Sequence, residues 1–123
     1  MVIIDTDVII ASMRGNDIAK QLIRKYTPSI FISAITEMEL YVGATNKTKK
    51  EAVESVLKMH QVVHVNKAIC ETALRLIKTY NTGNKSLFLS DALIAATCLQ
   101  EHYSLITFNT KDFAIIKGLQ LAK

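Results

Sequence analysis

Met1-Val2-Ile3-Ile4-Asp5-Thr6-Asp7 opens the chain with an apolar run that ends on an acid. Consecutive branched apolar residues of this kind predict a short buried strand. An unpaired carboxylate beside such a strand is costly in free energy, so Asp5 needs a compensating partner. The carboxyl end of this strand is therefore the first candidate for a functional site.

Strands and helices alternate along the rest of the sequence. Further strands are expected over 29–32, 61–65, 103–107 and 118–121, and helices over 8–13, 17–25, 33–43, 47–59, 67–80 and 91–101. Asp7, Asn66 and Ser90 are expected to cap the helices that follow them. Strands separated by helices imply parallel pairing with right-handed crossovers, which places functional groups beyond the carboxyl ends of the strands.

Composition limits the class of protein. The 123 residues are half apolar with a single proline, which predicts one folded domain spanning residues 1–123. No apolar run reaches the roughly 18 residues of a membrane span, and the N-terminus lacks the basic region of a signal peptide. We expect a cytoplasmic protein without membrane contact, in which Cys70 and Cys98 are buried thiols in predicted helices.

Helical geometry separates Glu39 from its neighbour Glu37. At about 100° per residue, one stripe of the helix carries Ile35, Met38, Glu39 and Val42. Glu37 faces roughly the opposite way. We expect Glu39 to turn toward the apolar side and Glu37 to be solvated. The alternative for Glu39 is an acid at the edge of the stripe, paired with a nearby lysine.

Two further acids lie in or beside segments that should be buried. Asp91 opens the apolar stretch 91–98, and Asp112 follows the strand that ends at Thr107. Capping and the helix dipole also favour an acid at a helix start, so Asp91 has a purely structural explanation as well. Several buried acids that converge on one pocket would be neutralised most simply by a divalent cation.

The motif Asp5-Thr6-Asp7 is compatible with two chemistries. In one, Asp5 is a metal ligand, Thr6 supports it and Asp7 caps the next helix. In the other, the motif begins a haloacid-dehalogenase-like phosphatase, with Asp5 as nucleophile and Asp7 as acid/base. That family also wants a downstream lysine and an adjacent acidic pair, whereas this chain has no Asp-Asp pair and is short for the family.

The basic residues lie outside the acidic positions, and the formal net charge is +4. They gather as Lys20, Arg24 and Lys25, as Lys47, Lys49 and Lys50, and as Lys67, Arg75, Lys78 and Lys85. A basic shell around an acidic centre suits a polyanion brought to a metal, although exposed lysines also simply keep helices soluble.

Together, these segments make the chain resemble a PIN domain and, more narrowly, the VapC toxins of toxin–antitoxin pairs. The resemblance is carried by residues 2–7, 33–44 and 89–97, and by 105–109 with Asp112-Phe113. It implies an α/β fold, a three-layer α/β/α sandwich with a central, mostly parallel sheet. It also implies a metal-dependent endoribonuclease that cleaves RNA phosphodiester bonds with Mg²⁺ or Mn²⁺.

The resemblance further implies partners and site residues. The expected partners are the RNA substrate, a second copy in a homodimer, and a VapB-like antitoxin that completes a heterotetramer or larger assembly. By match of motif, Asp5, Glu39 and Asp91 are the catalytic and metal-binding acids. Either Asn109 or Asp112 fills the fourth position; Asn109 can ligate through its amide oxygen but adds no charge, which leaves one metal or two open. Thr6 and Thr107 are expected to position the acids through hydrogen bonds.

Two other functional classes stay open beside the ribonuclease. One is the phosphatase, and the other is a non-catalytic PIN-like binding protein whose acids hold a structural cation. The helix 8–13 with Ile18, Leu22 and Ile23 offers apolar side chains to an antitoxin's C-terminal segment, unless these residues complete the core and the dimer interface.

Overall fold

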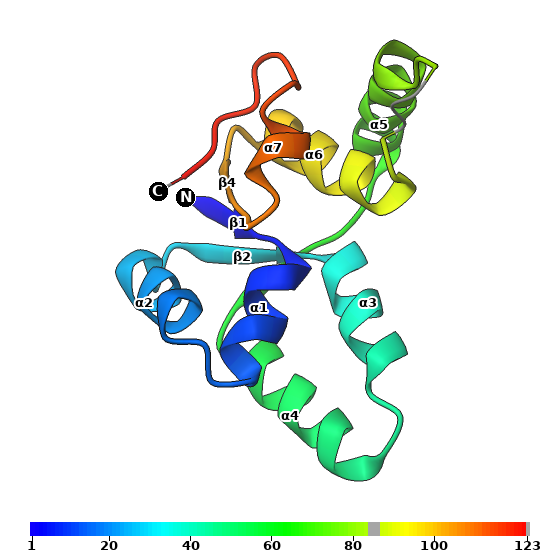
Figure 1. Cartoon of the computed structure of the whole chain (residues 1–123). Helices are drawn as coiled ribbons and strands as arrows, with labels where there is room; N and C mark the ends of the chain where they lie inside the picture. Colours follow the sequence, from blue (N-terminus) through cyan, green and yellow to red (C-terminus); the bar gives the residue numbers. More distant parts are fainter. Residues whose placement is uncertain (84–86, 123) are drawn as a thin grey trace.

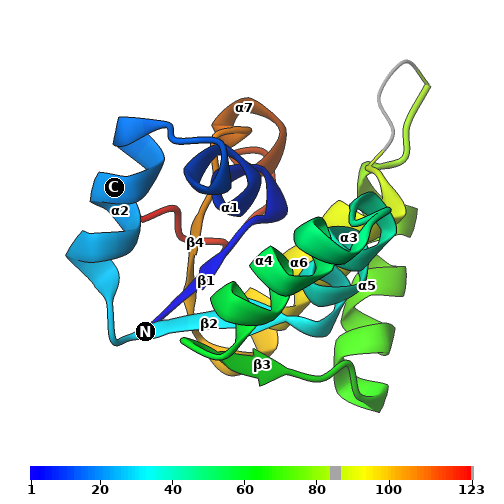
Figure 2. The same ribbon diagram turned by 90° about the horizontal axis from the view of Figure 1, so that it is seen from below.

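A parallel sheet with the strand order β3-β2-β1-β4 forms the centre of the computed structural model, which describes residues 1–83 and 87–122 (Figure 1). The strands are β1 (Val2–Ile4), β2 (Ile30–Ser33), β3 (Gln61–Val63) and β4 (Ser104–Ile106). The helices are α1 (Thr6–Met13), α2 (Asp17–Tyr26), α3 (Ala34–Gly43), α4 (Lys47–Leu57), α5 (Lys67–Tyr80), α6 (Leu89–Glu101) and α7 (Thr110–Phe113). Figure 2 shows the four strands side by side, from β3 at one edge to β4 at the other.

Helices cover both faces of this sheet, which confirms the predicted three-layer architecture. Helices α5, α6 and α7 lie on one face, and α1 to α4 lie on the other (Figure 1). The central strand β1 pairs with β2 on one side and with β4 on the other, in parallel register throughout. All strands therefore present their carboxyl ends at the same edge of the sheet.

Alternate residues of β1 belong to two separate cores. Ile3 packs with α5, α6 and Phe113, whereas Val2 and Ile4 pack with side chains of α1 to α4. Because successive side chains of a strand point to opposite faces, one three-residue strand contributes to both layers. Each buried aliphatic side chain of this size stabilises the fold by about 1.5–3 kcal/mol.

Helix starts differ from the predictions in two places. Helix α1 begins at Thr6, and its N-cap is Asp5, whose Oδ1 accepts the Thr6 N–H at 2.8 Å. The predicted cap Asp7 therefore lies in the first turn of the helix. Helix α6 begins one residue before Ser90, after Phe88, and has no side-chain cap. The start of α1 follows from the direct connection of β1 to this helix.

The strand predicted over 118–121 is wrong. Leu121 forms only an isolated bridge with Leu105. The short helix α7 (Thr110–Phe113) lies between β4 and this bridge in the sequence. Gly118 adopts a positive φ of 87°, which turns the chain so that it meets the edge strand β4 only after this residue. Phe113 of α7 is fully buried and fastens this helix to the core beneath it.

The two cysteines differ in their environments. Cys98 is buried in α6 as predicted, but Cys70 is exposed, so that prediction is wrong. The buried face of α5 carries Ile69, Ala73 and Leu76, and Cys70 lies beside this face rather than on it. Among the described residues, no helix is both long enough and apolar enough to cross a membrane.

Candidate metal-binding active site

Asp5 lies at the carboxyl end of β1, and both of its carboxylate oxygens accept hydrogen bonds. Oδ1 accepts the Thr6 N–H, and Oδ2 accepts the Thr107 hydroxyl at 2.8 Å from the end of β4. The residue is only 6% exposed. Burial raises the pKa of Asp5 to about 6; the Thr107 hydrogen bond opposes this rise, and the charges of Asp7 and Asp91 add to it. The predicted support from Thr107 is confirmed, whereas Thr6 supports Asp5 through its backbone.

Asp7 belongs to the same pocket. Its Oδ2 accepts the Phe108 N–H at 3.3 Å, while its buried Oδ1 has no hydrogen-bond partner among the described residues. Burial raises the pKa of Asp7, against the effect of nearby backbone amides. Sequence reasoning treated Asp7 only as a cap or as a phosphatase acid, and therefore missed it as a candidate ligand. An orphaned buried carboxylate oxygen is what a bound cation would satisfy.

Two threonine hydroxyls link Glu39 to the pocket by hydrogen bonds. The Thr6 hydroxyl donates to Glu39 Oε1 at 2.7 Å and lies 3.0 Å from Thr36 Oγ1. Since Thr6 has one hydroxyl proton and gives it to Glu39, the buried Thr36 hydroxyl donates to Thr6. This chain of hydrogen bonds joins α3 to the start of α1 and orients the Glu39 carboxylate.

The predicted reason for placing Glu39 is wrong. Met38 and Val42, which share its stripe on α3, are 58% and 82% exposed. The buried side of α3 instead carries Ala34, Thr36 and Leu40. Glu37 is partly buried like Glu39, so exposure does not separate the two acids. What distinguishes Glu39 is its hydrogen bond to Thr6.

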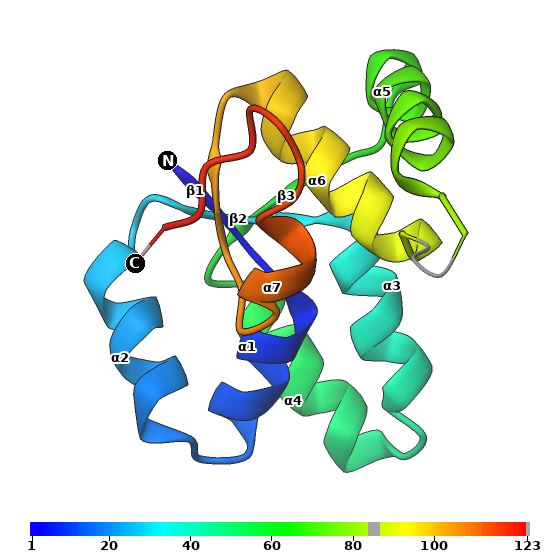
Figure 3. The same cartoon turned by 45° about the horizontal axis from the view of Figure 1, so that its top comes forward.

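Asp91 lies in the first turn of the buried helix α6, and the charges of three other acids of the site act on it. Burial raises its pKa most, and the charges of Glu39, Asp112 and Asp7 raise it further. Asp91 in turn contributes to the raised pKa of Asp5. Figure 3 shows how this is achieved: α7 lies close to the beginning of α1, with α3 and α6 beside them. Segments from both ends and the middle of the chain thus bring five acids into mutual range.

Asn109 and Asp112, the two candidates for the fourth position, contact each other. The Asn109 side-chain amide donates from Nδ2 to Asp112 Oδ2 at 3.0 Å, and its backbone N–H donates to Thr107 Oγ1 at 3.0 Å. Asp112 is exposed on α7 and adds to the negative potential at Asp91. Asn109 therefore links Asp112 to the turn that also holds Asp5.

The donor set suits a hard divalent cation. Among the described residues, none of these acids has a Lys or Arg partner within 4.0 Å, so their charges are compensated only by hydrogen bonds. No three Asp, Glu, His or Cys side chains in residues 1–83 and 87–122 lie close enough together to hold one ion by themselves. A divalent cation that keeps several waters needs only one or two direct carboxylates, so the residues present are compatible with a hydrated divalent cation.

The PIN domain family model matches residues 2–119 of the chain. Ribonuclease VapC1 of Rickettsia felis is 32% identical over an alignment of 126 positions, which covers 97% of this chain and 92% of the relative. A toxin–antitoxin complex from Klebsiella pneumoniae contains a chain with 34% identity and a TM-score of 0.84, covering 97% of this chain and 95% of its own. A chain of VapBC-1 from nontypeable Haemophilus influenzae has 27% identity and a TM-score of 0.85, covering 100% and 98%.

The raised pKa of Asp5 predicts a stability that depends on pH. Because its pKa rises from 3.8 to about 6 on folding, the native state loses stability as the pH increases through this interval. Asp5→Asn cannot ionise, and its side-chain amide can donate to Thr107, whose hydroxyl can accept. At pH 7.5 without metal, this variant should be more stable than wild type by about 2 kcal/mol.

Urea unfolding in EDTA at pH 7.5 and at pH 4 measures this difference, which should nearly vanish at the lower pH. Asp17→Asn changes an exposed acid on α2 and is the matched control, with an expected effect below about 0.5 kcal/mol. Equal stability of Asp5→Asn and wild type at pH 7.5 would contradict the prediction.

Proposed function

Since the chain belongs to the PIN domain family and, within it, to the VapC ribonucleases, we propose that it is a metal-dependent endoribonuclease and the toxin of a toxin–antitoxin pair. The observation that carries this proposal is the convergence of like charges on Asp91, whose pKa is raised by burial and by Glu39, Asp112 and Asp7. Because the chain belongs to this family, the alternative of a haloacid-dehalogenase-like phosphatase is no longer proposed. The family membership is also consistent with the hydrogen bonds to both Asp5 oxygens, which leave that group poorly suited to nucleophilic attack.

The proposed cofactor is Mg²⁺, for which Mn²⁺ can substitute. PIN-domain ribonucleases depend in general on a divalent metal. When bound, the ion polarises the scissile phosphate and lowers the pKa of a bound water. One or two of the carboxylates of Asp5, Asp7 and Asp91 would contact the ion directly, with the rest of its shell left to water and to the substrate phosphate. Asp112 is proposed for the fourth acidic position, and Asn109 for the residue that orients it.

The chain's own residues supply proton transfer and orientation. We assign Asp91 or Glu39 to orient the attacking water or to accept its proton. Thr6 and Thr36 hold Glu39 in one orientation. Thr107 does the same for Asp5. The basic groups on α2, α4 and α5 are proposed to attract the RNA backbone.

The antitoxin is proposed to occupy a cavity of about 390 Å³ between α1, α3 and α4. Ile10, Leu40 and Val53 give it apolar walls, and Glu39 lines it as well, so an occupant reaches the edge of the acidic pocket. Leu22, which the sequence places with this apolar patch, packs against the core beneath α2 and does not line the cavity.

The proposals for the oligomeric assembly and the cellular compartment also rest on membership in the family. We propose that residues 1–123 form a single domain that dimerises and that joins its antitoxin in a heterotetramer or a larger complex. We propose the cytoplasm as its compartment, since that is where an RNA-cleaving toxin meets cellular RNA.

Metal dependence is the first test of the proposed function. Millimolar Mg²⁺ or Mn²⁺ should raise the melting temperature, because a cation relieves the repulsion between the buried acids. It should also support cleavage of single-stranded RNA, and excess EDTA should abolish that cleavage. Full activity in the chelator would sink the metal-dependent mechanism, and a melting temperature that rises without any cleavage would favour the non-catalytic scaffold.

The acids can be tested one by one in the same cleavage assay. Asp5→Asn, Asp7→Asn, Glu39→Gln and Asp91→Asn should each lower kcat/KM by about a hundredfold or more. Glu37→Gln lies on the same helix as Glu39 and is the matched control, with wild-type activity expected. Asp112→Asn should cost more activity than Asn109→Ala. A silent Glu39→Gln beside an inactive Glu37→Gln would overturn the assignment of α3.

Antitoxin binding can be separated from catalysis with a pair of identical substitutions. Ile10→Glu places a charge in the apolar cavity and should weaken binding of the cognate antitoxin by about tenfold or more while RNA cleavage stays within a few-fold of wild type. Ile18→Glu, at an exposed position of α2 outside the cavity, should leave both unchanged. Calorimetric titration with the antitoxin measures this. The reverse pattern would place the binding groove on α2.

A further inference from the structure

Phe108 is an exposed aromatic residue at the acidic pocket. Its side chain is 43% exposed, and it packs into neither of the two cores. Among the other aromatic residues, Phe113 is fully buried and Phe31 stacks on Tyr103 with ring centroids 5.0 Å apart, whereas Phe88, directly before α6, is also exposed. The ring of Phe108 therefore contributes little to the stability of the fold in its present position.

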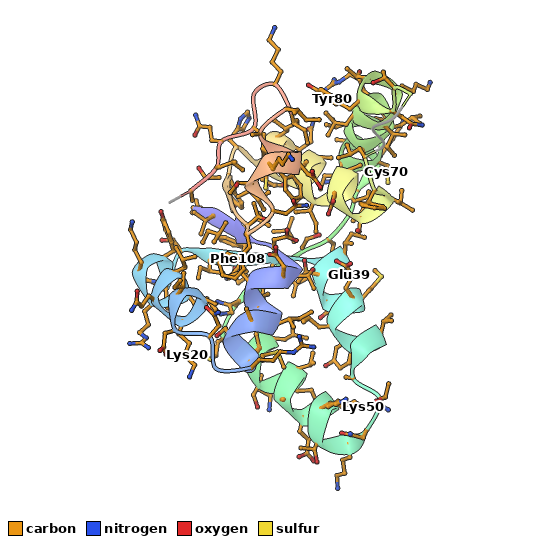
Figure 4. The ribbon with its side chains drawn as sticks, viewed as in Figure 1. Lys20, Glu39, Lys50, Cys70, Tyr80 and Phe108 are labelled. Carbon is orange, nitrogen blue, oxygen red and sulfur yellow. The ribbon has the colours of Figure 1, made fainter. Side chains whose placement is uncertain are left out.

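The backbone around Phe108 is tied to the acids on both sides. Its own N–H donates to Asp7 Oδ2 at 3.3 Å. The preceding Thr107 hydroxyl donates to Asp5 Oδ2 at 2.8 Å, and the following Asn109 N–H donates to that same hydroxyl oxygen at 3.0 Å. The base of the Phe108 ring is thus fixed with respect to the carboxylates. Figure 4 shows Phe108 and Glu39 on either side of the beginning of α1.

The chemistry of the pocket gives this ring a use. Clustered carboxylates without Lys or Arg partners among the described residues repel the phosphates of a nucleic acid until a cation is bound. A stacking contact with a base is not subject to that repulsion, and it accepts any base because every base has a π face. An exposed aromatic ring on a backbone held beside the carboxylates can therefore supply binding free energy that the acids cannot.

We propose that Phe108 is a stacking platform for a nucleobase adjacent to the scissile phosphate of single-stranded RNA. The inference rests on the proposed ribonuclease function and adds a base-binding residue to it, which acts on single-stranded RNA because bases in a duplex are not free to stack on a side chain. It assigns Phe108 to substrate binding and positioning. Loss of the ring should therefore act on KM more than on kcat.

The test begins with a pool of random-sequence single-stranded RNA, which is digested by wild-type protein with Mg²⁺ and sequenced to locate the cut. A short RNA containing that cut site is then made with an abasic ribose at each flanking position in turn. Phe108→Ala, Phe108→Leu and Phe108→Tyr are compared with wild type on every RNA. Met59→Ala removes another exposed apolar side chain, one that precedes β3 at the opposite edge of the sheet, and serves as the control.

Phe108→Ala should raise KM by about tenfold, equivalent to about 1.4 kcal/mol, with kcat within about threefold of wild type. Phe108→Tyr should keep the wild-type KM, and Phe108→Leu, which is apolar without a π face, should behave like the alanine variant. One abasic RNA should raise KM for wild type by a similar factor and leave no difference between wild type and Phe108→Ala. Met59→Ala should match wild type throughout.

Several results would overturn the inference. These are an unchanged KM for Phe108→Ala, a wild-type KM for Phe108→Leu, or losses that add to the abasic loss at every position. Weaker antitoxin binding with unchanged KM would make the ring a protein contact instead. Melting curves establish folding, and the leucine and tyrosine variants decide the matter if the alanine variant is unstable. Wild-type protein that cleaves no RNA with Mg²⁺ or Mn²⁺ would refute the proposed function, and the inference with it.

Discussion

The hydrogen bond from the Thr107 hydroxyl to Asp5 Oδ2, 2.8 Å long, is the constraint on which the rest of the site depends. It joins the carboxyl ends of β1 and β4, two strands from opposite ends of the sequence that pair in parallel. The same hydroxyl oxygen accepts the Asn109 N–H, so it also fixes the turn into α7. Hydrogen bonds to charged groups contribute about 1.5–3 kcal/mol each, enough to keep a buried carboxylate in place but less than its full desolvation cost.

The pocket is therefore held together by the remainder of the fold rather than by its own contacts. Burial raises the pKa of Asp5, Asp7 and Asp91, and like charges raise those of Asp5 and Asp91 further, so the ionised pocket opposes folding. Two aliphatic cores, one on each face of the sheet, offset this cost. A cation bound at these acids would release the repulsion that folding imposes and would thereby stabilise the native state.

Much of the fold could be predicted from the sequence because strand and helix periodicity records burial directly. The buried helix α6 and the cap at Asn66 are examples, the latter with its side chain accepting the Ile69 N–H at 2.9 Å. The errors fall where tertiary contacts outweigh local preference. Asp5 rather than Asp7 caps α1 because β1 ends directly at the helix, and Ser90 lies within α6, which begins at Leu89. The bend at Gly118 limits the last predicted strand to one bridge.

The acids of the site show a deeper limit of pattern reasoning. An apolar stripe identifies the face of a helix that meets a core, but a polar pocket between helices is lined by groups that hydrogen-bond to one another. Glu39 illustrates this, because the residues that share its stripe are exposed while Thr6 and Thr36 hold its carboxylate. Asp7 was missed for the same reason: its position in a first helical turn has a sufficient local explanation. Its buried Oδ1 has no hydrogen-bond partner among the described residues. This oxygen marks Asp7 as a candidate ligand only once Phe108 and Asp91 are seen to approach it from distant segments. Convergence of charges across elements is therefore the property that marks this site, and it exists only in the folded chain.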